Sequence, residues 1–164
     1  TSKCSTIDSP TVCIYTNISL LQILLIKALL KSGTHECGGV LMGEHIGTNH
    51  FRVSSLTVQK SGTIASFVRG ITDAIKAIRL FHKSTNNNYQ KFNYLGEWHS
   101  HPLFSVQPSS KDHHTMRELV SDPKVGANFV VLLIFHLKNN HLEGSAHTYL
   151  PDGSYYRSTL DLER

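Results

Sequence analysis

The most constraining feature of this sequence is a histidine pair followed at a fixed distance by a serine and an aspartate. His99 and His101 end an aromatic and apolar segment, and Ser109 and Asp112 follow after a short loop. Side chains alternate along a strand, so both histidines are expected on one face of a strand over residues 92–101. Residues i and i+3 share a helix face, so Ser109 and Asp112 are expected on one side of a helix that begins near Ser109. The chain must therefore bring the end of a strand against the start of a helix.

These residue types suit a catalytic metal ion, because two imidazoles and a carboxylate leave the fourth position of a zinc ion open. Each half of the motif also has an ordinary explanation. Ser109 and Asp112 can form a capping box, and His-x-His on a strand is more often incidental than metal-binding. Capping and metal binding are compatible, since Ser109 can begin the helix and still face the metal. Together with Glu36 upstream, the whole pattern predicts a metal site.

With these intervals the chain resembles the JAMM family of zinc metallopeptidases, also called JAB or MPN+. That family has a Glu on an early strand, then His-x-His, seven residues, Ser, two residues and Asp, and no motif position departs from it here. The segment from Glu36 to Gly43 resembles the Glu-containing strand, and the similarity covers roughly residues 12–149. In the sequence of residues 95–102 and in its compact length, the chain resembles the bacterial JAB branch of the family. Within that branch the chain resembles the CD-NTase-associated JAB peptidases of CBASS anti-phage operons.

The resemblance implies roles for the motif residues. His99, His101 and Asp112 would bind one Zn²⁺, Glu36 would act as general base toward the zinc-bound water, and Ser109 would donate a hydrogen bond to the oxyanion. The implied substrate is the amide bond after the C-terminus of a ubiquitin-like protein or CD-NTase joined to a target, with an E1/E2-like conjugating system as a further partner. Two alternatives stay open: a JAMM hydrolase that acts on a small-molecule amide or sulfur-carrier precursor, and a non-catalytic MPN scaffold.

Glu97 competes with Glu36 for the role of general base. It lies two residues before His99, so strand alternation puts it on the histidine face. From the residues alone the two glutamates have similar claims, and the resemblance favours Glu36. We expect Glu36→Ala to abolish turnover while zinc is retained, and Glu97→Ala to leave appreciable activity. Residues 62–91 are expected to determine which partner binds. The alternative is that they form an ordinary packed helix and a surface loop with no role in recognition.

Composition limits the class of protein. With 164 residues and 40% hydrophobic content, the chain is expected to form one peptidase domain over residues 11–164 after a flexible segment 1–10. A net charge of +4 from scattered basic residues gives no reason to expect a nucleic-acid partner. Three cysteines cannot all pair within one chain, which favours free thiols and a cytoplasmic location. They are Cys4, Cys13 and Cys37.

The apolar run over residues 18–30 is too short and too interrupted by polar residues for a membrane span. It predicts a buried helix over 18–31 that is capped by Asn17 and ends near Gly33. Further helices are expected over 71–82 and from 109 to about 120. Strands are expected over 12–15, 36–45, 51–58, 92–101, 128–137 and 142–149, with a short edge strand over 154–160. This alternation indicates an α/β sandwich with a mixed central β-sheet flanked by helices, and the resemblance implies the single-domain MPN version, which is cytidine-deaminase-like.

Overall fold

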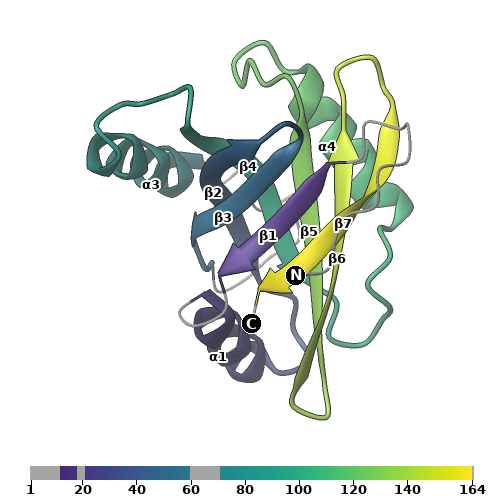
Figure 1. The fold of residues 1–164 in the computed structure, drawn as a ribbon. Coiled ribbons are helices and arrows are strands. Elements are labelled where there is room, and N and C mark those ends of the chain that lie inside the picture. Colours follow the sequence, from purple (N-terminus) through teal and green to yellow (C-terminus); the bar gives the residue numbers. More distant parts are fainter. Residues whose placement is uncertain (1–11, 18–20, 60–70, 164) are drawn as a thin grey trace.

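The computed structural model describes residues 12–17, 21–59 and 71–163, and within these ranges it contains seven strands and three helices (Figure 1). The segment predicted to be flexible, 1–10, and the first part of the 62–91 region lie outside the described residues. The strands are β1 (Cys13–Asn17), β2 (Gly38–Gly47), β3 (His50–Leu56), β4 (Phe92–Ser100), β5 (Val130–Lys138), β6 (His141–Tyr149) and β7 (Tyr155–Glu163). The helices are α1 (Ile23–Ser32), α3 (Ile71–Ser84) and α4 (Ser110–Ser121).

The strands close into a barrel in the order β1-β3-β2-β4-β5-β6-β7. β1 pairs in parallel with both β3 and β7, β4 pairs in parallel with β5, and the other neighbours are antiparallel. The prediction of a mixed α/β fold is confirmed. The strands form a closed barrel where a sandwich with a central sheet was predicted, and the predicted edge strand over 154–160 is wrong, because β7 pairs on both sides, with Leu160 opposite Ile14. Because the barrel is closed, the backbone N–H and C=O groups of β7 are hydrogen-bonded on both sides. In an edge strand, one row of these groups would be unpaired.

Both faces of strand β5 are buried, which explains its continuous apolar sequence. One set of alternate residues packs inside the barrel with the buried side of α1, and the other set packs beneath α4. The inner set is Val131, Leu133 and Phe135, and the outer set is Val130, Leu132 and Ile134. Figure 1 shows α1 at one end of the barrel and α3 against the outside, where Ala74 packs on Val40 and Met42 of β2. Helices α3 and α4 therefore frame the outer face of β4.

Helix α1 ends at Gly33 as predicted, where a φ of 59° favours glycine. Its predicted start is wrong. Asn17 is the last residue of β1, where it pairs with Glu163, and Gln22 occupies the N-cap position without a side-chain cap. Extended backbone in the β1–β7 ladder thus outweighed the local preference of asparagine for capping. None of the described helices is long and apolar enough to cross a membrane.

Candidate metal centre

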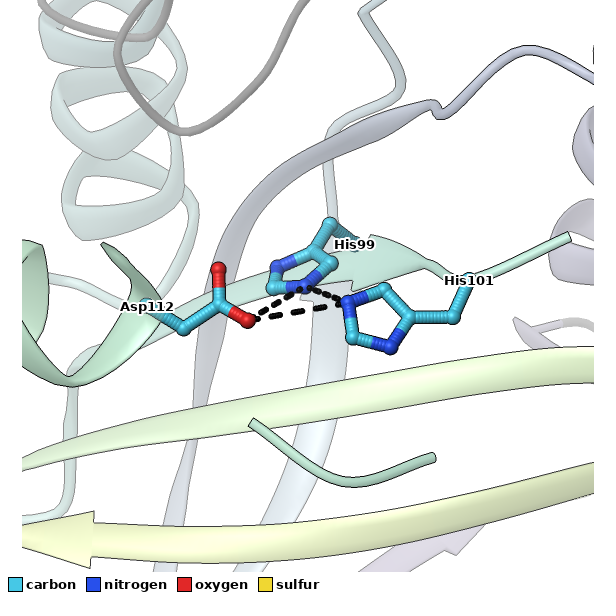
Figure 2. Close-up of side chains that lie close together, drawn as sticks. All are labelled: His99, His101 and Asp112. Atoms are coloured by element: carbon cyan, nitrogen blue, oxygen red, sulfur yellow. Dashed lines mark hydrogen bonds and ion pairs between the residues drawn. The ribbon is translucent and has the colours of Figure 1, made fainter. Parts of the chain in front are cut away.

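His99, His101 and Asp112 come together at one point (Figure 2). His99 lies at the end of β4, His101 is the first residue after that strand, and the carboxylate comes from the first turn of α4. The two histidine Nε2 atoms are 2.9 Å apart. Oδ2 of Asp112 lies 3.7 Å from Nε2 of His99 and 3.6 Å from Nε2 of His101. All three residues are buried. The strand and helix periodicity inferred from the sequence therefore places these side chains correctly.

These separations fit a tetrahedral zinc site. Zinc binds nitrogen and oxygen ligands at about 2.0–2.2 Å, which puts neighbouring ligand atoms roughly 3.4 Å apart in a tetrahedron. The observed separations of 2.9, 3.6 and 3.7 Å bracket that value. Two imidazoles and one carboxylate also match catalytic zinc sites, in which the fourth position takes water or substrate. The triad is positioned to hold a metal ion, while its assignment as the zinc ligand set stays a prediction.

The start of α4 fixes the carboxylate through the predicted capping box. Ser109 is the N-cap residue, and its Oγ accepts a hydrogen bond from the backbone N–H of Asp112 at 3.2 Å. The backbone N–H of Ser109 in turn donates to Oδ2 of Asp112 at 2.7 Å. The same Oδ2 faces both histidines, so capping and metal binding are geometrically compatible. The cap uses Oγ as an acceptor and leaves the hydroxyl proton of Ser109 unused.

Electrostatics favour a charged carboxylate at this position. Burial by itself would raise the pKa of Asp112. The nearby imidazoles of His101 and His99, together with the hydrogen bond from the backbone N–H of Ser109, outweigh burial and hold the pKa of Asp112 well below its usual range. The site therefore presents a negative charge beside two imidazoles, which suits a cation.

Glu36 is held beside the triad by backbone pairing that extends past the start of β2. It lies two residues before that strand, so the predicted strand over 36–45 begins later than expected. The N–H of Cys37 donates to Oγ of Ser100 at 3.0 Å, and the N–H of Ser100 donates to the carbonyl of Cys37 at 2.8 Å. Glu36 is half-buried and lines the same cavity as the triad.

The two glycines after Cys37 allow this close pairing. A Cβ on Gly38 would lie 2.5 Å from the carbonyl oxygen of Trp98, and a Cβ on Gly39 would collide with the carbonyl of Thr57. Any side chain here would push β2 away from its neighbours, and Glu36 would move with it. Cys37 is fully buried, and neither it nor Cys13 forms a disulfide bond in the described part of the chain.

Glu97, the competing base, lies in the packed interior rather than in the cavity. It is 2% exposed, and it pairs with Val40 and Leu132, which belong to the apolar clusters beneath α3 and α4. Burial raises the pKa of Glu97 to about 8, so the carboxyl is mostly protonated at neutral pH. The described residues that line the cavity include Glu36 and not Glu97.

An open cavity of about 370 Å³ gathers all five predicted site residues. It is also lined by residues that the motif did not single out, namely Phe104, Ser105, Gln107 and Lys111. Ser105 matters through its backbone carbonyl, which accepts a hydrogen bond from Nδ1 of His101 at 2.8 Å. Because a carbonyl can only accept, Nδ1 carries a proton, and the neutral ring of His101 then presents the lone pair of Nε2 to the centre. A backbone acceptor has no residue-type signal, so the sequence could not reveal it.

The chain belongs to the JAB family of prokaryotes: residues 21–146 match the family described as prokaryotic homologs of the JAB domain. This confirms the resemblance inferred from the motif.

Two curated relatives carry the name CD-NTase/cGAS isopeptidase. The protein from Vibrio cholerae is 35% identical over 94 residues, which cover 54% of this chain and 57% of that protein. The protein from Enterobacter hormaechei is 25% identical over 99 residues, which cover 60% of this chain and 53% of that protein. The match therefore spans a little over half the length of each relative.

Solved structures support the fold alone. A protein from Desulfitobacterium hafniense has a TM-score of 0.62 at 16% identity, over 92% of this chain and 93% of that one. A protein from Salinibacter ruber has a TM-score of 0.51 at 17% identity, over 91% of each chain.

Proposed function

We propose that this protein is a zinc-dependent isopeptidase that hydrolyses the amide bond between the C-terminal tail of a CD-NTase, or of a ubiquitin-like protein, and its target. The observation that carries the proposal is a single open cavity lined by Glu36, Ser109 and the His-His-Asp triad. The two relatives named CD-NTase/cGAS isopeptidase support the choice of substrate class. The reaction would reverse conjugation by an E1/E2-like system that takes part in anti-phage defence.

Each site residue has a role that follows from its chemistry. His99, His101 and Asp112 hold the zinc ion, which when bound polarises the scissile carbonyl and lowers the pKa of water to about 7. Glu36 accepts a proton from the attacking water and delivers it to the departing nitrogen, so the C–N bond breaks with release of a neutral amine. Ser109 uses its hydroxyl proton to stabilise the carbonyl oxygen as that oxygen gains negative charge.

The proposal is tested with a fusion that carries the C-terminal tail of a CD-NTase in amide linkage to a reporter protein. We expect the wild type to cleave the fusion after the tail. Glu36→Gln removes the base with little change in shape, and should lower turnover by about 10²–10⁴-fold while zinc stays near one per chain. Glu97→Gln is the matched control at the competing carboxyl and should retain turnover. Loss of cleavage in Glu97→Gln with activity in Glu36→Gln would reverse the assignment of the base.

The same assay separates the alternatives. Hydrolysis of short Gly-Gly amides without cleavage of protein conjugates would identify a small-molecule or sulfur-carrier hydrolase. Stoichiometric zinc without hydrolysis of either substrate class would identify a scaffold. Cleavage of an unrelated ubiquitin-like fusion, with the CD-NTase tail left intact, would exclude the CD-NTase part of the proposal.

A further inference from the structure

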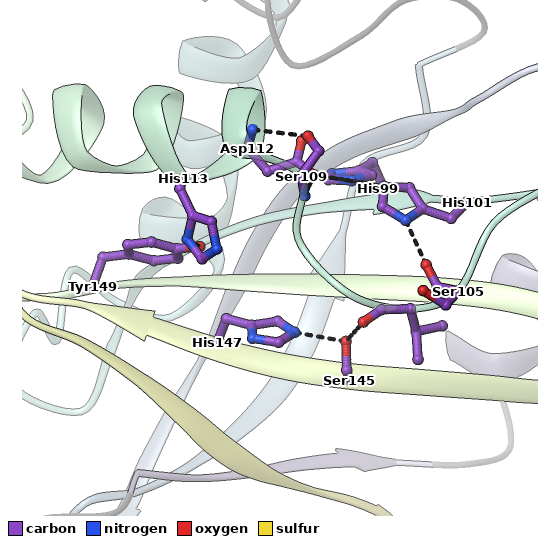
Figure 3. A network of polar contacts seen from close by, with 10 residues as sticks. His99, His101, Ser105, Ser109, Asp112, His113, Ser145, His147 and Tyr149 are labelled. Atoms are coloured by element: carbon purple, nitrogen blue, oxygen red, sulfur yellow. Dashed lines mark hydrogen bonds and ion pairs between the residues drawn. The ribbon is translucent and has the colours of Figure 1, made fainter.

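A chain of buried polar side chains runs beneath the loop that joins β4 to α4 (Figure 3). Oγ of Ser145 contacts the carbonyl oxygen of Val106 in that loop and lies 2.7 Å from Nε2 of His147. Nδ1 of His147 lies 2.8 Å from the hydroxyl of Tyr155 on β7, and the two rings stack at an angle of 13°. Ser145 and His147 are 3% and 0% exposed. None of these groups belongs to the JAMM motif.

Counting protons fixes the direction of the three hydrogen bonds that join Val106, Ser145, His147 and Tyr155. The carbonyl of Val106 can only accept, so the single hydroxyl proton of Ser145 points to it. Oγ of Ser145 must then accept a proton from Nε2 of His147. Burial lowers the pKa of His147 to about 4, so the ring is neutral near pH 7 and has only this one N–H. Nδ1 of His147 therefore accepts from the hydroxyl of Tyr155.

The end of this chain is adjacent to the metal centre. Val106 directly follows Ser105, whose carbonyl holds the Nδ1 proton of His101. Both carbonyls belong to the segment 102–109, in which most side chains are exposed. Among the described residues, the hydrogen bonds that hold the middle of this segment, residues 103–107, are those to the Ser105 and Val106 carbonyls, and the side chain of Val106 is partly buried against the cluster beneath α4. Fixing the Val106 carbonyl thus also fixes the neighbouring peptide that orients the His101 ring.

We infer that Ser145 and His147 are positioning residues that act through the Val106 and Ser105 carbonyls on the His101 imidazole and so set the affinity for zinc. The inference rests on the proposed function in that zinc is the metal. It extends that function to β6, beyond the motif. Loss of an outer group that orients a metal ligand typically lowers metal affinity by 10–100-fold. Here the hydrogen bonds of Ser145 and His147 act on His101 through the loop backbone.

The test compares two serine-to-alanine substitutions. Ser145→Ala removes the bond to the loop. Ser158→Ala is the matched control, because Ser158 is likewise a buried serine, on β7, where its Oγ lies 2.6 Å from Oγ1 of Thr148 and, among the described residues, forms no hydrogen bond to the loop. Both variants lose one buried hydroxyl and should show comparable falls in melting temperature. Competition with a chromophoric chelator should show zinc affinity about tenfold weaker in Ser145→Ala and within twofold of wild type in Ser158→Ala.

A second variant keeps the test decisive if Ser145→Ala fails to fold. Tyr155→Phe retains the ring beside His147 and removes only the hydroxyl at the far end of the chain. It should weaken zinc affinity by a smaller factor, about two- to fivefold. Equal affinities in all variants and the wild type would overturn the inference.

The proton assignment has its own readout. Long-range ¹H–¹⁵N spectra of the wild type at pH 7 should show His147 as the neutral Nε2–H tautomer. An Nδ1–H tautomer would contradict the assigned directions of the hydrogen bonds between Tyr155, His147 and Ser145. Failure of the proposed function looks different. An enzyme that binds zinc but cleaves no conjugate would still show the affinity difference between Ser145→Ala and Ser158→Ala.

Discussion

Asp112 and Glu97 are both buried acids, 7% and 2% exposed, and their surroundings drive their pKa values in opposite directions. Around Asp112, burial is outweighed by two imidazoles and a backbone N–H, so its pKa falls. Around Glu97, Oε1 has no hydrogen-bond partner among the described residues, and burial raises its pKa to about 8. The partners supplied by a site, rather than depth alone, decide whether a buried carboxyl is a charged ligand or a neutral core group.

The largest expected effect comes from removing the charge of Asp112. Asp112→Asn keeps an oxygen that can accept from the Ser109 N–H, so helix α4 should still be capped. Without the negative charge, the zinc content should fall from near one per chain to near zero, and turnover should fall to background. Elemental analysis and the fusion assay measure both. Asp122→Asn, the same change at the opposite end of α4, is the control and should alter neither.

His147, a buried base, can be compared with the two buried acids, and its expected effect on the pH dependence of stability is intermediate in size. The pKa of His147 is lowered to about 4 by burial, so between about pH 6.5 and 4 the unfolded chain binds a proton that the folded chain does not. Folded wild type should therefore lose stability as the pH falls through this window, by about 3 kcal/mol from this residue. In urea titrations, His147→Gln should lack that part of the pH dependence. Parallel pH curves for the two proteins would show that His147 does not stay neutral when folded.

The smallest effect is expected from Glu97→Gln, because glutamine has nearly the shape of a protonated carboxyl. At pH 7 the melting temperature should move by less than about 3 °C, which corresponds to under about 1 kcal/mol in a domain of this size. Zinc affinity should be unchanged. A large loss of zinc in this variant would show that Glu97 acts on the metal centre and that its separation from Asp112 is wrong.

The parts of this molecule that were predicted from sequence are those governed by local periodicity. His99 and His101 share a face because strand side chains alternate, and Ser109 and Asp112 meet because they lie one helical turn apart. The end of α1 at Gly33 follows from the same local chemistry. Glu36 was assigned to the site by resemblance to a family motif, since the residues alone did not distinguish it from Glu97 as the general base.

The parts that were missed depend on contacts between distant segments. Closure of the barrel by β7 and the pairing of Asn17 with Glu163 are matters of long-range strand register. The contact between Ser145 and Val106 joins residues 39 positions apart. One signal was present, because Ser145, His147 and Tyr149 alternate along β6 and share a face. Nothing local showed that this polar face would meet the loop beside the metal centre.

The most direct test of the account is a crystal structure of the zinc-loaded protein with data collected at the zinc absorption edge. If the triad binds zinc, one strong anomalous peak per chain is expected, about 2.0–2.2 Å from Nε2 of His99, Nε2 of His101 and a carboxylate oxygen of Asp112. Glu36 and Ser109 should face the open coordination position. A zinc peak on other residues, or none at full zinc loading, would contradict the central claim that this triad is the metal centre of a JAB isopeptidase.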